Sequence, residues 1–200
     1  MTEFDAAGRQ IYHQGFLDGS CFLYSLANAY KALTGSKVTR EKWDLAIQHV
    51  PEPANFLRDV GATGLSYQDA VALIEAMLDG FSEPGERFEI HQLSASAGIG
   101  DLCREISPGS VVNFAFSGKT EVHHPRNHVV CAVAASLDPP VLHLACSAAF
   151  SSRHLQDGSY EERCHPLLGR YSNDSIALDS PVEIAPNWRW RLTLVSGRTG

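Results

Sequence analysis

The sequence has no run of lysine or arginine and no basic stripe. Its 16 basic residues are outnumbered by 23 acidic ones, and the net charge of −7 argues against a nucleic-acid surface. No apolar run reaches the roughly 18 residues that a membrane span needs, so we expect no membrane partner. The segment MTEFDAAGRQ has neither a basic n-region nor an apolar h-region. It therefore does not look like a signal peptide, and we expect a cytoplasmic protein; delivery into a host cell stays open.

Cysteine is also sparse, with five residues and no CxxC pair. An odd number without a dense framework predicts free thiols in a reducing compartment. The histidines of HHPRNH, residues 123–128, match neither helical nor knuckle spacing of zinc sites. We expect no metal and no cofactor, with His123 and His124 in a solvated loop.

The composition is that of an ordinary globular protein. Apolar residues make up 44% and charged residues 20% of the 200 positions, which is enough to bury a substantial core. There is no internal repeat or low-complexity segment. We predict a single domain over residues 1–200, with a helical lobe over about 1–85 and a sheet lobe over about 86–200.

Apolar residues recur at helical spacing in the first lobe. The pattern predicts three helices, over about residues 20–34, from 39 to just before Pro51, and over 66–80. Gly35 is expected to end the first helix and Gly80 to stop the third. Residues 53–64 are predicted to form a short helical turn.

From Arg87 onward the apolar period changes to two, which predicts strands. The expected strands are residues 87–93, 110–118, 128–136, 141–149 and 188–197, with a short helix over 99–106. The turn LDPP at 137–140 predicts an antiparallel hairpin, and WRWR at 188–191 alternates as a half-exposed edge strand would. Residues 151–175 show no clear period and are expected to form a long irregular connection.

The chemistry-bearing motif is QGFLDGSCFLYSLANAY, residues 14–30, in which a Gly-Ser turn leads through Cys21 into a helix. A thiol is a good nucleophile only as thiolate, and a helix N-terminus stabilises that anion. The backbone N–H of Cys21 and the amide of Gln14 are candidate donors to an oxyanion. Asp18 is expected to serve a turn.

His128 is the candidate base. It opens the run HVVCAVAAS, which is predicted to be a strand. With Cys21 on a helix and His128 leading a strand, the chain resembles the papain-like cysteine hydrolase superfamily. DGSCFL, from Asp18, is similar to the DGNC-type motif of ovarian-tumour deubiquitinases. The Gln–Cys–His order resembles bacteriocin-processing peptidase domains, and the VVNF strand before a His-led strand resembles phytochelatin-synthase-like transpeptidases.

The resemblance implies a papain-like α+β fold, in which a helical part carrying the nucleophile packs on an antiparallel sheet. It also implies a third residue, an Asp or Asn after the next strand, that orients the imidazole. Eighteen residues after His128 stands Cys146, which we expect to pack as a small apolar group. The third member is then missing, replaced or supplied by Asn127 or Ser147. A Cys–His dyad can still work, because the third residue mainly fixes tautomer and orientation.

Two classes of function follow. In the first, the chain is a thiol protease-like hydrolase or acyl transferase that acts on a peptide or isopeptide-type amide through Cys21, His128 and Gln14. In the second, it is a catalytically silent papain-like module that binds a peptide or protein partner. The intact Cys21 and His128 favour the enzyme. Oligomeric state and substrate identity stay open.

Overall fold

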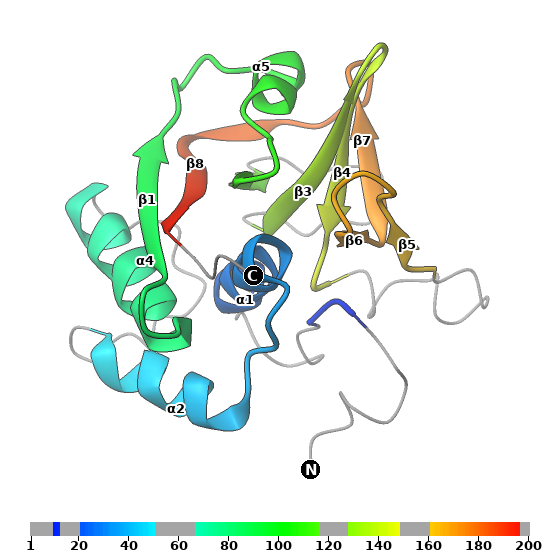
Figure 1. Ribbon diagram of the computed structural model, residues 1–200. Coiled ribbons are helices and arrows are strands. Elements are labelled where there is room, and N and C mark those ends of the chain that lie inside the picture. Colours follow the sequence, from blue (N-terminus) through cyan, green and yellow to red (C-terminus); the bar gives the residue numbers. More distant parts are fainter. Residues whose placement is uncertain (1–9, 13–20, 51–66, 117–127, 149–160, 197–200) are drawn as a thin grey trace.

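Helices lie on both faces of a six-stranded sheet in the computed structural model of the chain (Figure 1). The structure describes residues 10–12, 21–50, 67–116, 128–148 and 161–196. The predicted turn at 53–64 lies outside these ranges. So do the predicted sites at Gln14, Asp18 and Asn127, and the histidines 123 and 124.

The three predicted helices of the first lobe are present as α1 (Cys21–Thr34), α2 (Arg40–His49) and α4 (Tyr67–Phe81). As predicted, Gly35 follows the last residue of α1 and terminates the helix, with a φ of 72° and its N–H donated to the Lys31 carbonyl at 2.9 Å. The short predicted helix of the second lobe is α5 (Ile99–Arg104).

The prediction that Gly80 stops the third helix is wrong, because α4 continues through it to Phe81. Gly80 is needed there for close packing. A Cβ built on Gly80 would lie 2.2 Å from the Ala46 Cα of α2. The missing side chain allows α2 and α4 to approach one another backbone to backbone.

All pairings in the main sheet are antiparallel, and the strand order is β1-β8-β2-β3-β4-β7. The predicted strands appear as β1 (Arg87–Gln92), β2 (Ser110–Phe116), β3 (Val129–Leu137), β4 (Pro140–Ala145) and β8 (Ile184–Ser196). The LDPP hairpin is confirmed by the pairing of Leu137 with Pro140. Helices and an antiparallel sheet make the fold α+β.

Two expectations for the second lobe are wrong. Part of the segment expected to be irregular forms strands β5 (Arg163–Cys164), β6 (Tyr171–Ser172) and β7 (Asp174–Ala177), and β7 extends the main sheet. The WRWR segment is not on an edge, because β8 lies between β1 and β2. Trp188, Trp190 and even Arg189 are buried. The Arg189 guanidinium is accommodated by donating to the carbonyls of Ser94, Ala95, Ala97 and Ile184.

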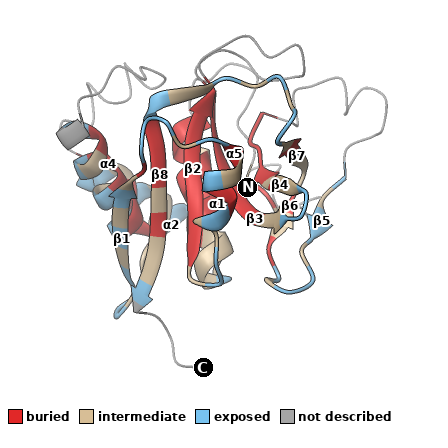
Figure 2. Ribbon diagram, turned by 90° about the horizontal axis from the view of Figure 1, so that it is seen from above, coloured by how far each residue is buried: buried red, intermediate tan, exposed pale blue. Residues whose placement is uncertain are grey.

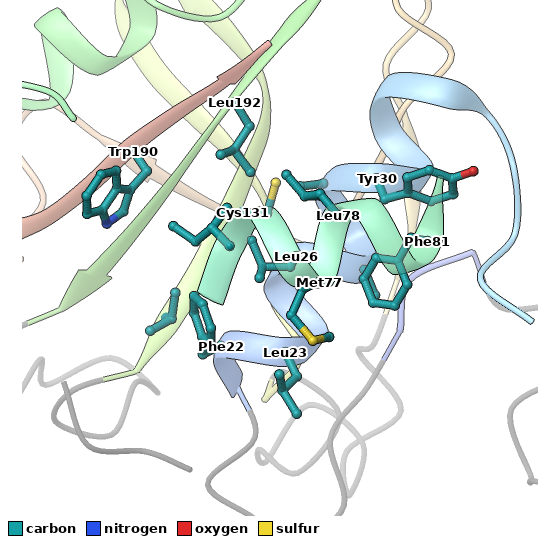
Figure 3. Packing of buried hydrophobic residues seen from close by; sticks show 14 of the residues in the cluster. Phe22, Leu23, Leu26, Tyr30, Met77, Leu78, Phe81, Cys131, Trp190 and Leu192 are labelled. Carbon is teal, nitrogen blue, oxygen red and sulfur yellow. The ribbon is translucent and has the colours of Figure 1, made fainter. Parts of the chain in front are cut away.

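The sheet buries both of its faces. In Figure 2, β2 is buried along its whole length, whereas β1 at the edge alternates between exposed and half-buried residues. The larger apolar cluster lies between the sheet and the helices α1 and α4, and the smaller lies on the α5 side. Figure 3 shows the larger cluster, in which side chains of α1, α4, β3 and β8 pack together, among them Phe22, Leu23, Leu26, Tyr30, Met77, Leu78, Phe81, Cys131, Trp190 and Leu192.

A buried arginine ties α1 to the sheet. The Arg170 guanidinium donates to the Ala32 carbonyl near the end of α1 at 2.9 Å and to the Ser110 and Val133 carbonyls of β2 and β3, each at 3.0 Å. It also donates to Pro108. Burial lowers the pKa of Arg170 from its usual value. Because its donors all point at carbonyls, the buried cation joins three elements that are far apart in the sequence.

Within the described residues, none of the helices has the length and apolar character that crossing a membrane requires.

Replacing Gly80 by Ala should destabilise the fold by about 1–3 kcal/mol, because the added methyl overlaps the Ala46 backbone. Gly100→Ala in α5 is the matched control. Its Cβ would meet nothing closer than 3.9 Å, so improved helix propensity should leave stability unchanged or raise it by up to about 1 kcal/mol. Urea unfolding of both variants checks this, and equal effects at the two positions would contradict the described contact of α2 with α4.

Candidate active site

Cys21 is the first residue of α1, as the motif predicted. Its sulfur accepts a hydrogen bond from the backbone N–H of Val129 at 3.4 Å. The helix N-terminus and this N–H both place positive potential at the sulfur.

His128 lies immediately before β3 and is buried, with 1% of its surface exposed. Its carbonyl accepts a hydrogen bond from the Phe116 N–H at 3.0 Å, and the next residue pairs with Ala115 of β2. Two strands in register therefore hold the imidazole at the end of the sheet, beside the start of α1. The sequence predicted that Cys21 and His128, 107 residues apart, lie together. The hydrogen bond from Val129, the residue after His128, places the Cys21 sulfur beside the start of β3, and Cys21 contributes to the raised pKa of His128.

The contact at the other side of the imidazole was not expected. His128 Nε2 lies 3.2 Å from the sulfur of Cys146, which is fully buried and directly follows β4. Cys146 stands at the position where the family pattern has an Asp or Asn. It contacts the imidazole instead of merely filling apolar space. The roles suggested for Asn127 and Ser147 stay predictions, since Asn127 lies outside the described residues and Ser147 is buried beside Cys146.

The two sulfurs change the protonation of His128. Burial disfavours the imidazolium, but the charge and hydrogen bonding of Cys146, together with the interactions of Cys21, outweigh it and raise the pKa of His128 to about 10. The imidazole thus stays protonated at neutral pH when a thiolate is beside it. An imidazolium–thiolate pair is the reactive form of a Cys–His site.

Polar contacts inside the apolar interface fix the first turns of α1. Asn113 of β2 donates its side-chain N–H to the Ser25 hydroxyl at 3.0 Å, and Ser25 donates to the Phe22 carbonyl at 2.7 Å. Phe22 in turn packs edge-on against Trp188 of β8, with ring centroids 5.4 Å apart. These contacts set the position of α1 on the sheet directly behind Cys21. These contacts were not predicted, although a lone Asn in the apolar run SVVNFAF was a signal for them.

The segment leading toward Gln14 is held against α1. The Asn28 side chain accepts from the Tyr12 N–H at 2.7 Å and donates to the Tyr12 carbonyl at 3.1 Å. The Tyr12 hydroxyl accepts from the Val38 N–H at 2.6 Å. The predicted oxyanion donor Gln14 is two residues beyond this anchor but outside the described residues, so its role stays a prediction.

Metal-ligating side chains do not gather in the described part of the chain: no three His, Cys, Asp or Glu residues there lie in an arrangement that could hold an ion.

Comparison of the chain with protein-family models, with curated proteins and with solved structures finds no match.

The pKa values of His128 and His143 should be shifted in opposite directions from the usual histidine value. His128 should stay doubly protonated well above the usual value of about 6.5 and lose a proton only near pH 10. His143 should be neutral at pH 7, because burial and the nearby His165 lower its pKa. Imidazole nitrogen NMR across this pH range checks both. A His128 that titrates at or below its usual value would contradict the described contacts with the two sulfurs.

Proposed function

We propose that the chain is a papain-like cysteine hydrolase or acyl transferase that acts on a peptide or isopeptide-type amide. The observation that carries this proposal is the approach of Cys21, at a helix N-terminus, to the start of the strand that His128 leads, through a 3.4 Å hydrogen bond from Val129. The raised pKa of His128 supports it, because an imidazolium beside the sulfurs of Cys146 and Cys21 favours a thiolate next to it.

The distribution of elements also supports a papain-like architecture. The described helices before residue 82 include the one that bears the nucleophile, and the strands that follow include the one led by the base. This is the division of labour that the resemblance implies. Membership of the papain-like superfamily is therefore part of the proposal.

In the proposed reaction, the Cys21 thiolate attacks the amide carbonyl carbon and forms a tetrahedral oxyanion. The backbone N–H of Cys21 and the Gln14 amide donate to that oxyanion. As the C–N bond breaks, His128 gives its proton to the leaving amine, and a thioester on Cys21 remains.

The acyl group then leaves Cys21 by a second attack. His128, now neutral, takes a proton from water or from an acceptor amine as that group attacks the thioester, and the thiolate is expelled. Attack by water gives hydrolysis, and attack by an amine gives transpeptidation.

The test is selective alkylation. At about pH 6 an ordinary thiol is almost wholly protonated, so iodoacetamide should modify Cys21 ahead of Cys103, Cys131, Cys146 and Cys164. Replacing His128 by Ala should slow the modification of Cys21 by about ten- to a hundredfold, because the stabilising imidazolium is gone. Peptide mass mapping over time gives each rate.

Cys164 is the internal control, because it is exposed and lies outside the site. Its rate should be the same in both proteins. His128→Gln is a second variant that keeps a polar side chain, and thermal unfolding shows whether each protein is folded. Equal modification of Cys21 and Cys164, unchanged without His128, would contradict an activated nucleophile. That result would favour the competing function, a catalytically silent module that binds a peptide or protein partner.

A further inference from the structure

We propose that Cys146 is the positioning residue of His128, with its sulfur accepting a hydrogen bond from Nε2–H, and that Asn173 holds Cys146 in place for this role. The inference rests on the proposed function, since it assigns the residue that orients the base. It concerns two residues that the motif itself does not contain.

The first support is the contact of the sulfur with the imidazole. The 3.2 Å between His128 Nε2 and Cys146 Sγ is a close N–H to sulfur distance, and both groups are buried. A hydrogen bond from Nε2 to the sulfur keeps a proton on Nε2, so Nδ1 is the nitrogen left to exchange a proton with Cys21. The opposite polarity, with the thiol donating to Nε2, would put the proton of the neutral ring on Nδ1. That tautomer could not accept a proton from an attacking water or amine through Nδ1.

The second support is the way Cys146 is held. The Asn173 carboxamide accepts from the Cys146 N–H at 2.8 Å and donates to the Cys146 carbonyl at 2.9 Å. The Asn173 backbone N–H also donates to the Leu144 carbonyl at 2.9 Å. The backbone pairing of β4 with β7 extends to Leu144 and Asp174. Beyond this pair, the Asn173 carboxamide takes the place of a backbone partner for Cys146. Both polar groups of the Cys146 backbone are thereby fixed, which sets the direction of its side chain toward His128.

The third support is chemical. A sulfur is a weaker acceptor than a carboxylate or carboxamide oxygen, yet it can perform the same task of fixing one tautomer. An amide oxygen at this position should therefore replace the sulfur, whereas a methyl group should not. This difference separates an orienting role from simple filling of space.

The test compares Cys146→Ala with Cys146→Asn, and Cys131→Ala is the matched control. Cys131 is an equally buried thiol on the neighbouring strand β3, but it belongs to the apolar cluster on the other face of the sheet. The rate of Cys21 alkylation at about pH 6 should fall about tenfold in Cys146→Ala, and should lie within about threefold of the parent rate in Cys146→Asn and Cys131→Ala.

Imidazole nitrogen NMR on the same proteins gives a readout that a purely structural role would not move. The Nε2–H tautomer of neutral His128 should dominate in the parent protein and in Cys146→Asn, and should lose that dominance in Cys146→Ala. Asn173→Ala should shift both readouts in the direction of Cys146→Ala. If Cys146→Ala does not fold, the parent tautomer and the Cys146→Asn rate still decide the matter.

The two proposals fail in different ways. If Cys21 is preferentially alkylated in the parent protein, but Cys146→Ala retains the parent rate and tautomer, the role of Cys146 is overturned and the proposed function stands. If Cys21 shows no preference over Cys164 in the parent protein, the proposed function itself fails, and the role of Cys146 fails with it.

Discussion

The site depends on the packing of one helix across the end of two strands. Because α1 crosses β2 and β3, its first residue meets the first residues of β3, and the Cys21 sulfur accepts the Val129 N–H at 3.4 Å. A shift of the helix by one turn, about 5 Å, would remove the sulfur from the imidazole. The other site residues can act on Cys21 only if this contact is kept.

Contacts in the surrounding interior hold α1 in this position on the sheet. Apolar burial alone is non-directional and would tolerate sliding of α1 on the sheet. Directional contacts are added at both ends of the helix. Near its start, Asn113 and Ser25 link β2 to the first turn, and near its end Arg170 joins the Ala32 carbonyl to the sheet. Breaking hydrogen bonds between buried polar groups is costly, so sliding of α1, which would separate these partners, is disfavoured.

Local pattern predicted much of this molecule and tertiary pairing explains the rest. Helical spacing and alternation were sufficient for α1, α2 and the hairpin of β3 with β4, because each is encoded by neighbouring residues. The place of β8 was not encoded locally, since the last strand of the chain inserts between β1 and β2. Likewise β7 is four residues of mixed polarity, DSIA, and it forms only because β4 offers it a partner.

The candidate site divides in the same way. Cys21 and His128 were recognisable as a helix N-terminus and a strand start. The contact of Cys146 with His128 was not, because it depends on the register of β3 against β4, which includes an irregularity between Ala132 and Ala134. The partner of Cys146, Asn173, comes from a segment without any period. Such contacts form only when the strands are paired, so local sequence patterns do not predict them.

The proposed function requires that the negative charge paired with the His128 imidazolium lie on Cys21, whereas the charge of Cys146 also raises the pKa of that imidazole, so the two sulfurs must be told apart. Ultraviolet absorbance of thiolate at about pH 6, where ordinary thiols are protonated, measures this directly. The account predicts one thiolate per chain, which is lost in Cys21→Ser and in His128→Ala. A parent protein without this absorbance, or one in which it persists after Cys21→Ser, would contradict the account.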